Sequence, residues 1–559
     1  GLGGYHLACD ARSPAAVAEL RRRKHRDEKP FAVMVPDVAA AELLAEVGPA
    51  ERALLLSPAC PIVLLRKHQP GTIAEEVAPR NPYLGVMLPY TPLHHLLLRA
   101  VGGIPLIMTS GNRSDEPIAY QDDEALTKLA GIADLFLVHD RPIHVRCDDS
   151  VTRMVDGLEL PMRRSRGYAP RPIELPFRCP VPILAVGGQL KGTFALGQGR
   201  QALLSHHLGD LDHYDAYRAF VRDIDLYQEL FGITPRILAH DLHPDYASTR
   251  YAQDRAARLG NVLLAVQHHH AHLASCLAEH GLNEPVIGVT FDGTGYGLDG
   301  AVWGGEFLVG DSRQFRRAAH LRYVGMPGGD QAIREPWRMA AAHLRDAGVS
   351  LPALAARISP VQYGTIQRML ERRFNTPQTS SAGRLFDAVA SLVGVCDRVS
   401  YEGQAAVELE WLASASVAEG AYPFDIQQLS PENATNAPLL LDTRPLIRAV
   451  VAEVQQGTEV ARIARRFHTT VVKLITAVCL RLRQATGLET VVLSGGVFLN
   501  ALLTQETVAG LEQEGFRVYR HRRVPPNDGG LSLGQLAVTA ARTGERGCQP
   551  PDSSELSGG

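Results

Sequence analysis

A short run of histidines carries the strongest chemical signal in the sequence. His268 and His272 stand four residues apart in Val266-Gln267-His268-His269-His270-Ala271-His272-Leu273. On a helix this spacing places both imidazoles on one face, where they can bind one metal ion. A polar helix face or a pair of core histidines would give the same pattern, so a metal site requires further ligands.

Two acidic turns further along the chain supply such ligands. Asp292 lies in Phe291-Asp292-Gly293-Thr294-Gly295-Tyr296-Gly297, and Asp528 lies in Pro525-Pro526-Asn527-Asp528-Gly529-Gly530. We predict a metal site of His268, His272, Asp292 and Asp528. The histidine run is not an HExxH motif, which disfavours a zinc peptidase. Imidazole and carboxylate ligands suit iron, zinc or manganese.

Three glycine-rich turns follow apolar, strand-like runs. Residues 183–186 lead into Gly187–Thr193, residues 286–291 into Asp292–Gly297, and residues 491–493 into Ser494-Gly495-Gly496-Val497 and a helix. Backbone N–H groups in such turns can surround an anion, because no Cβ blocks its approach. One such turn is weak evidence, but this order of three is typical of actin-like ATPases. We expect Lys191 to neutralise phosphate directly and Asp292 to act on it through a metal.

The bulk composition limits the class of protein. The chain has 559 residues, of which 45% are hydrophobic and 21% are charged. This length and composition indicate a globular protein of two or more domains. The net charge of −3 is not the basic excess that is typical of nucleic-acid binders. No apolar run could span a bilayer and no signal peptide is visible. Eight scattered cysteines without a CxxC pair predict a cytoplasmic location. The beginning at Gly1 resembles the interior of a domain, so we expect a truncated chain.

A proline-rich stretch divides the sequence. Residues 166–176, with Pro180 and Pro182 after them, are not expected to continue a helix or a central strand. We therefore predict a first domain of residues 1–172, a linker of 173–182, a second domain of 183–542 and a disordered tail of 543–559. Residues 429–436 are expected to form an exposed loop. In the first domain, apolar runs at 31–35, 61–65 and 105–108 alternate with helical segments, which favours an α/β fold.

Polar and basic clusters recur beside the strand ends of the first domain. They are Lys24–Pro30, Thr109-Ser110-Gly111-Asn112 and Arg163-Arg164-Ser165-Arg166. Each cluster alone is explained by a solvated loop. Their recurrence at strand ends, where α/β folds bind ligands, favours a binding site.

These residues carry a resemblance to known families. The first domain resembles YrdC-type domains through Tyr5–Ala11, Lys24, Arg26, Lys29-Pro30, Ser110 and Asn112. The second resembles the Kae1 family through His268, His272, Gly383-Arg384-Leu385-Phe386-Asp387, Ser494–Val497 and Asn527-Asp528. Across about residues 1–540 the chain is similar to the HypF carbamoyltransferases, with Ser205–Leu211, Asp241–Tyr246 and Tyr401–Ala406 as further matching phrases.

The resemblance implies a fold and a reaction. The fold is a YrdC-like α/β domain followed by an actin-like (ASKHA) Kae1-type domain with two duplicated α/β lobes. The first domain would join carbamate to ATP, with Mg²⁺, to give carbamoyl adenylate and pyrophosphate. The second would transfer the carbamoyl group to the C-terminal cysteine thiol of the partner protein HypE, where it is dehydrated to a thiocyanate that provides the cyanide ligands of [NiFe]-hydrogenase.

The resemblance also implies residue roles. Lys24, Arg26 and Lys29 would offset phosphate charge, while Ser110 and Asn112 hydrogen-bond the nucleotide or acyl group; Arg164 and Arg166 are weaker candidates. Iron or zinc would occupy the second-domain metal site. The residues implied to bind ATP or the adenylate there are Lys191, Asp292, Gly293, Gly295, Gly383, Asp387, Ser494, Gly495, Gly496 and Asn500, with Gly383 and Asp387 at the ribose and Ser494–Val497 at adenine.

The sequence departs from the family pattern in places. The acylphosphatase domain and paired CxxC motifs with which HypF proteins usually begin are missing, which implies that this chain alone does not hydrolyse carbamoyl phosphate efficiently but still activates carbamate. Gly192 replaces an expected Asn, and His206 an expected Gln.

Two other functions are compatible with parts of the sequence. An enzyme of the same lineage could carbamoylate a sugar hydroxyl or deliver threonylcarbamoyl to tRNA, although the near-neutral charge disfavours tRNA. An ATP-switched binding protein like Hsp70 could share the actin-like fold, but it would need neither the histidine pair nor the first domain.

Overall fold

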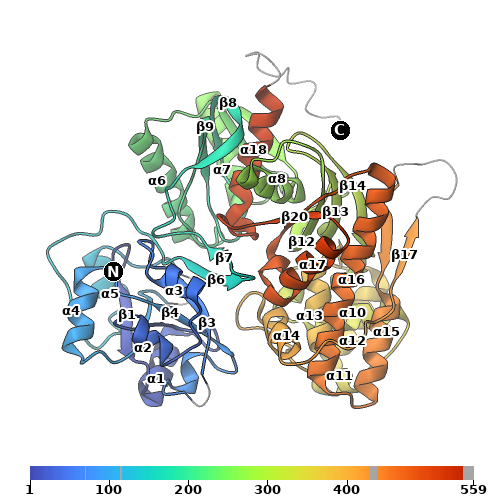
Figure 1. Ribbon diagram of the computed structural model, residues 1–559, viewed down its shortest axis with the longest axis horizontal. Helices are drawn as coiled ribbons and strands as arrows, with labels where there is room; N and C mark the ends of the chain where they lie inside the picture. The colour runs from blue at the N-terminus through green and yellow to red at the C-terminus, as the bar shows by residue number, and fades with distance from the viewer. Residues whose placement is uncertain (69–70, 114–115, 429–436, 545–559) are drawn as a thin grey trace.

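The first domain is built around one mixed β-sheet in the computed structural model, which describes residues 1–68, 71–113, 116–428 and 437–544. The strand order is β1-β5-β2-β4-β3-β6-β7, and the helices flank the sheet (Figure 1). The strands are β1 (His6–Asp10), β2 (Ala32–Met34), β3 (Ile62–Arg66), β4 (Tyr83–Met87), β5 (Leu106–Ser110), β6 (Val151–Val155) and β7 (Leu158–Arg163). The helices are α1 (Pro14–Lys24), α2 (Val38–Glu42), α3 (Pro49–Leu55), η1 (Glu75–Val77), α4 (Pro92–Ala100) and α5 (Asp122–Lys128).

The second domain has two lobes, each with its own sheet. The first-lobe sheet has the order β11-β10-β8-β9, formed by β8 (Ile173–Ala185), β9 (Ala195–Leu204), β10 (Ile237–Asp241) and β11 (Val262–Val266). Its helices are α6 (Tyr214–Phe231), α7 (Ala247–Leu259), α8 (His268–His280) and α18 (Leu531–Gly544), with η3 (Asp528–Gly530) directly before α18.

The second-lobe sheet has the order β17-β18-β14-β13-β12-β19-β20, with β15 and β16 beside β13. Its strands are β12 (Val286–Tyr296), β13 (Val302–Gly310), β14 (Phe315–Leu321), β15 (Val324–Gly325), β16 (Gln378–Thr379), β17 (Asp425–Gln428), β18 (Leu439–Asp442), β19 (Thr490–Ser494) and β20 (Arg517–Arg520). Its helices are α9 (Gln331–Arg334), α10 (Trp337–Ala347), α11 (Pro352–Arg357), α12 (Pro360–Arg372), α13 (Ala382–Leu392), α14 (Gln404–Ser414), α15 (Arg444–Gln455), α16 (Val460–Thr486), η2 (Gly496–Leu499) and α17 (Ala501–Gln513).

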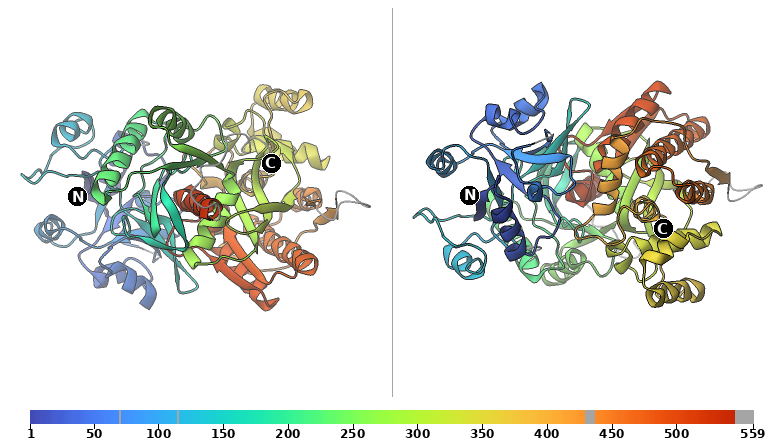
Figure 2. Two further views of the ribbon diagram at one scale, coloured as in Figure 1. Left: turned by 90° about the horizontal axis from the view of Figure 1, so that it is seen from above. Right: turned by 90° about the horizontal axis from the view of Figure 1, so that it is seen from below.

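The two lobes repeat one strand arrangement. β8 pairs antiparallel with β9 and parallel with β10, which pairs parallel with β11. β12 likewise pairs antiparallel with β13 and parallel with β19, which pairs parallel with β20. Helix α18 packs against β8, whereas its neighbour α8 packs against β12 and β19, so this helix pair lies between the sheets (Figure 2). The expected duplicated actin-like architecture is confirmed.

The stretch 173–182, expected to be a linker, is instead part of the long strand β8. The part of β8 that pairs with β10 begins only at Ile183. Pro176 and Pro180 therefore lie where one edge of the strand is open, so their missing N–H groups remove no ladder bond there. The register with β9 shifts on either side of Cys179, as expected for a strand that accommodates prolines.

The glycine-rich run 292–297, expected to be a hairpin turn, also belongs mostly to a strand. β12 continues to Tyr296, with an irregularity in its pairing to β13 between Phe291 and Gly295. The chain reverses later, where the Gly297 N–H donates to the Ala301 carbonyl. The irregularity explains the run, because glycine tolerates a bulged strand and close neighbours. By contrast, the predicted turn after Val491–Leu493 is confirmed, since β19 leads into η2 and α17.

Other sequence expectations fall at the limits of the described residues. The predicted strands at 31–35, 61–65 and 105–108 correspond to β2, β3 and β5. Residues 429–436 and 545–559 lie outside the described residues, and Thr543 and Gly544 end α18. None of the described helices combines the length and apolarity needed to cross a bilayer.

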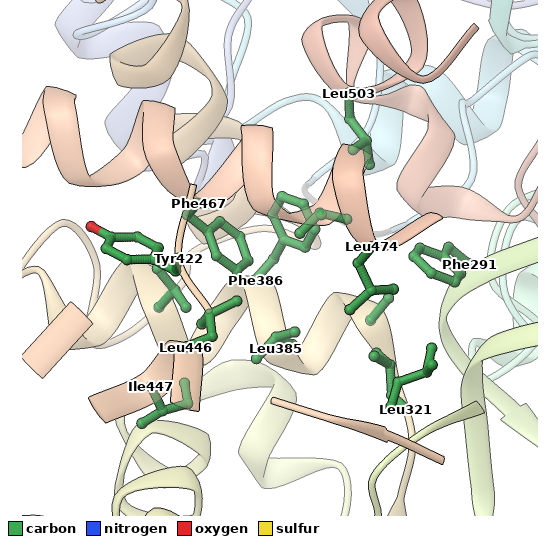
Figure 3. Close-up of a cluster of buried hydrophobic side chains, with 14 of the residues drawn as sticks. Phe291, Leu321, Leu385, Phe386, Tyr422, Leu446, Ile447, Phe467, Leu474 and Leu503 are labelled. Atoms are coloured by element: carbon green, nitrogen blue, oxygen red, sulfur yellow. The ribbon is translucent and has the colours of Figure 1, made fainter. Parts of the chain in front are cut away.

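A large apolar core holds the helices of the second lobe against its sheet (Figure 3). Phe386 of α13 is 1% exposed, and its ring lies 4.8 Å from that of Phe467 on α16. Aromatic rings in this edge-to-face arrangement bury much area and add a specific attraction. The core thereby fixes α13, which carries Gly383 and Asp387.

We expect Phe386→Ala to lower the stability of this lobe by about 3–5 kcal/mol, because it leaves a cavity among large side chains. Chemical denaturation followed by tryptophan fluorescence measures the change. Phe374→Ala is the control, since Phe374 is 71% exposed. Equal stabilities of the two variants would contradict this description of the core.

Candidate metal and nucleotide site

The start of helix α8 presents the predicted histidine pair. The Gln267 side chain accepts a hydrogen bond from the His270 N–H and so caps the helix at its first turn. His268 and His272 lie one turn apart and are 0% and 1% exposed. Their neighbour His270 faces another way, with Nε2 2.8 Å from the Asp311 carbonyl oxygen. Helical geometry thus selects the predicted pair from the run.

The four predicted metal ligands come together. The ligand atoms of His268, His272, Asp292 and Asp528 all lie within 4.8 Å of one another. Nε2 of His268 is 3.4 Å from Asp292 Oδ2 and 3.7 Å from Asp528 Oδ1, and Nε2 of His272 is 3.6 Å from both of these oxygens.

This cluster fits a metal ion better than it fits hydrogen bonds. Distances of 3.4–3.7 Å are long for N–H···O bonds, and both Nε2 atoms are buried without a hydrogen-bond partner. Ligands about 2.1 Å from a tetrahedral metal lie about 3.4 Å apart. Two buried imidazoles and two carboxylates therefore have the chemistry and spacing of a transition-metal site.

Asp241, at the end of β10, orients one of the imidazoles. Its Oδ2 lies 2.8 Å from Nδ1 of His268, and the carboxylate is fully buried. A proton on Nδ1 that donates to Asp241 leaves Nε2 as the ligand atom, which is the usual carboxylate–histidine–metal arrangement. The segment Asp241–Tyr246 matches the family, but the sequence predicts no role in the site for Asp241.

The charges in the cluster shift the pKa of each group. Burial alone would lower the pKa of both histidines, but Asp241 raises that of His268 well above its ordinary value, and Asp292 and Asp528 raise that of His272. Burial would raise the pKa of Asp292, yet the two imidazoles hold it well below its usual range. The carboxylates therefore offset the effect of burial on both imidazoles.

Several predicted nucleotide residues meet at the same place. The Gly496 N–H donates to Asp292 Oδ1 at 2.8 Å, which joins the turn after β19 to the metal cluster. A Cβ on Gly496 would lie 2.9 Å from that oxygen, and one on Gly383 would lie 2.9 Å from the Gly293 Cα. Gly495 has a φ of 100°, a conformation that favours glycine.

Gly295, predicted to bind the nucleotide, packs closely against the histidine rings. A Cβ there would lie 2.6 Å from Cδ2 of His268 and 2.5 Å from Cε1 of His269. Its glycine lets β12 cross the histidine rings closely, so steric fit to α8 accounts for it. Gly192 is explained similarly, because its N–H donates to the Gly209 carbonyl and a Cβ would lie 2.9 Å from that oxygen.

Three predicted nucleotide residues make contacts within the protein. Lys191 Nζ lies 2.6 Å from both carboxylate oxygens of Glu402, across the two lobes. Asp387 pairs with Arg384 at 2.8 Å. Asn500 caps α17 through the Leu503 N–H and donates to Nε2 of His468. Of these, Lys191 is the one whose partner belongs to the other lobe.

Three residues of the site predicted in the first domain lie together. Nζ of Lys24 lies 2.7 Å from the Ser110 carbonyl, 2.6 Å from the Asn112 carbonyl and 2.5 Å from Asn112 Oδ1. The Ser110 hydroxyl donates to the same Oδ1. Burial, together with Arg26 and Lys29, lowers the pKa of Lys24 to about 7, but three oxygen acceptors match the three donors of an ammonium group. Lys24 thus organises the 110–112 turn.

The other basic residues of the first domain are held differently. Arg26 donates to the Lys29 and Pro30 carbonyls of its own loop. Arg164 binds the carbonyls of Leu204, Tyr168 and Arg171, while Arg166 pairs with Asp149 and binds the Ala59 and Cys60 carbonyls. Both arginines are buried. Arg164 joins the first domain to Leu204 of the second, whereas the contacts of Arg166 lie within the first domain.

Comparison with known proteins follows the same division of the chain. Residues 1–165 match a family described as Telomere recombination that covers Sua5, YciO and YrdC proteins. Residues 178–279 match the HypF Kae1-like domain, and residues 288–535 match a carbamoyltransferase Kae1-like domain, second subdomain. The fold and these matches define the class as a transferase with a YrdC-like domain joined to a Kae1-like domain.

Full-length relatives place the chain in one family. It is 45% identical to carbamoyltransferase HypF2 of Cupriavidus necator, over 97% of this chain and 71% of the relative. It is 42% identical to carbamoyltransferase HypF of a Synechocystis species, over 96% and 70%. A crystal structure of full-length HypF in the phosphate- and nucleotide-bound form superposes with a TM-score of 0.93 at 43% identity, over 98% and 71%. The chain belongs to the HypF carbamoyltransferase family.

We expect Asp241→Asn to weaken metal binding by about 10–100-fold, because an amide cannot fix the charge and orientation of His268 as a carboxylate does. Elemental analysis and competition with a chromogenic chelator measure the affinity. The matched control is Asp245→Asn, at an exposed position on the same loop that pairs with Arg250. Equal losses in the two variants would rule out the orienting role.

Metal binding should weaken as the pH falls. The raised pKa values of His268 and His272 mean that protons compete for the ligand nitrogens, and metal uptake must release them. The affinity should therefore fall by about tenfold per pH unit for each proton displaced, as the pH decreases below the raised pKa values of the two imidazoles. Zinc titrations at several pH values, with circular dichroism to confirm folding, test this. A pH-independent affinity would contradict it.

Proposed function

We propose that the chain makes carbamoyl adenylate in residues 1–172 and transfers its carbamoyl group to a thiol in residues 183–542. The observation that carries the proposal is the bond from Gly496 to Asp292, because it joins a phosphate-type turn to the metal cluster. The family names, all carbamoyltransferases, support the group transferred. In the family this reaction serves hydrogenase maturation.

The first step would take place around the loop that contains Lys24, Arg26 and Lys29. An oxygen of carbamate attacks the α-phosphorus of ATP, the bond to the bridging oxygen breaks, and pyrophosphate leaves with Mg²⁺. Arg26 and Lys29 would offset the charge that develops on the phosphates. Lys24 would hold Ser110 and Asn112 in place, so that the turn can hydrogen-bond the carbamate or the nucleotide.

Positive groups of both domains lie near His207. Burial, followed by the charges of Arg163, Lys191, Arg146 and Lys29, lowers the pKa of His207 well below its ordinary value. The Lys191 backbone N–H donates to the Asp210 carboxylate. Burial would lower the pKa of Lys191, but the negative charges of Glu402 and Asp528 raise it. A cationic surrounding suits the anionic phosphate of the adenylate, which supports transfer without release into water.

The second step would take place at His268, His272, Asp292 and Asp528. A bound iron or zinc ion would supply positive charge to the phosphate of the leaving group. The Gly495–Gly496 turn and Gly383 would contact the nucleotide. The sulfur of the acceptor attacks the carbamoyl carbon, the bond to the phosphate oxygen breaks, AMP leaves, and the thiol proton is lost.

The acceptor thiol would come from another protein. Burial raises the pKa of Cys9 to about 11, and burial of Cys276 raises its pKa well above the ordinary value. Such thiols are poor nucleophiles because the reactive form is the thiolate. The family resemblance points to the C-terminal cysteine of HypE as the acceptor.

Separate variants should divide the reaction into its two steps. We expect Arg26→Ala and Lys29→Ala to lower carbamate-dependent ATP–pyrophosphate exchange by about 100-fold or more, because each removes a charge from the phosphate site. His268→Ala with His272→Ala should spare exchange but abolish carbamoyl transfer and metal binding. Radiolabelled pyrophosphate and mass spectrometry of the acceptor measure the two steps.

Arg22→Ala is the control for the first domain, because the Arg22 side chain is 71% exposed on α1. Exchange that does not depend on carbamate would refute the proposed first step. Unchanged metal content in the double histidine variant would refute the proposed metal site.

A further inference from the structure

A buried chain of polar side chains lies behind the metal cluster. Nε2 of His521 is 2.9 Å from the Ser494 hydroxyl, and Nδ1 of His521 is 2.9 Å from Glu279 Oε2. The same hydroxyl lies 2.9 Å from the carbonyl oxygen of His272. His521 and Ser494 are 1% and 0% exposed. A chain this deeply buried requires each of its polar groups to be satisfied.

Both ring nitrogens of His521 take part in the chain. The Ser494 hydroxyl has one proton and donates it to the His272 carbonyl, which can only accept. Nε2 of His521 therefore donates to the Ser494 oxygen, while Nδ1 faces the Glu279 carboxyl group. The ring thus bridges Ser494 and Glu279. Burial would raise the pKa of Glu279, but His521 holds it below its ordinary value.

Glu279 also binds the backbone that leads to Asp528. Its Oε1 accepts hydrogen bonds from the N–H groups of Arg522 and Arg523, at 2.5 Å and 2.6 Å. The same segment continues to Pro526, whose carbonyl accepts from the Gly495 N–H at 2.9 Å. Helix α8, on which Glu279 lies two turns after His272, is thereby tied to the segment that delivers the fourth ligand.

Three segments that build the site therefore meet at one ring. Helix α8 carries His268 and His272, the end of β19 and the turn after it carry Ser494 and Gly496, and the segment after β20 carries Asp528. His521 contacts the first through Glu279 and the second through Ser494, and it belongs to the third. In sequence these segments lie far apart, so tertiary contacts set their relative positions, and the His521 ring adds side-chain contacts to the backbone bonds between β19 and β20.

We propose that His521 is a positioning residue of the transfer centre, which with Glu279 and Ser494 holds the metal ligands at the separation that an ion requires. The inference rests on the metal site proposed above. A merely structural histidine would contribute to stability alone, whereas a positioning residue also sets the metal affinity. A variant that lowers the metal affinity indicates a positioning role, whereas one that lowers only the folding stability indicates a structural role.

The test uses the full chain stripped of metal and titrated with zinc against a chromogenic chelator. His521→Gln keeps polarity and approximate size but has no second ring nitrogen with which to bridge Ser494 and Glu279. Glu279→Gln removes the carboxylate and leaves the ring in place. Each is expected to weaken zinc binding by about tenfold or more, while carbamate-dependent ATP–pyrophosphate exchange in the first domain is unchanged.

His343→Gln is the matched control, because it removes another buried imidazole of the same domain, on α10. It should leave zinc affinity unchanged whatever its effect on thermal unfolding. If His521→Gln and Glu279→Gln bind zinc as tightly as the wild type, the positioning role is overturned, but the proposed metal site is not. A wild-type chain that binds no zinc would overturn the metal proposal itself. If His521→Gln does not fold, Glu279→Gln and Ser494→Ala decide by the same measurement.

Discussion

Burial of two carboxylates and two imidazoles in one small volume is the constraint on which the rest of the second domain depends. Ionised groups removed from water are costly unless partners satisfy them. Asp241 binds His268, and the Gly496 N–H binds Asp292, yet two imidazole nitrogens remain without a hydrogen-bond partner. A cation between them, as proposed above, would complete the arrangement. The glycines around the cluster follow from the same crowding, since a Cβ at Gly295 or Gly496 would meet a ligand side chain.

The junction between the domains is built from the same loops that form the two sites. Glu28, between Arg26 and Lys29, binds Arg80 and Gln404, and Gln404 begins the helix that follows Glu402. Glu402 in turn pairs with Lys191. Arg153 of β6 pairs with Glu410 of α14 across the same junction. Partly buried ion pairs with several hydrogen bonds hold geometry better than exposed ones. The first and second domains are thus joined by direct contacts.

Sequence patterns failed where a local signal had two structural explanations. The prolines of residues 173–182 indicate an interruption, but a strand with one open edge accommodates them, as β8 does. The glycines of residues 292–297 indicate a turn, but close packing against the rings of α8 also requires glycine. In both cases the deciding factor is the neighbouring element, and its identity is not encoded in the local residues. Helical periodicity had no such ambiguity, so the spacing of His268 and His272 predicted their shared face.

The sequence alone determined the local facts: a histidine pair on one helical face, the order of glycine-rich turns, the α/β character of both halves and the four residues able to bind a metal. Spacing along one helix or one turn sets these properties. Only the tertiary structure decided that Asp241 orients His268, that Glu402 pairs with Lys191, and that Glu279 and His521 join three distant segments. Such partners are chosen by burial, because a polar group removed from water binds whichever group the fold places beside it, and no spacing in the sequence records that choice.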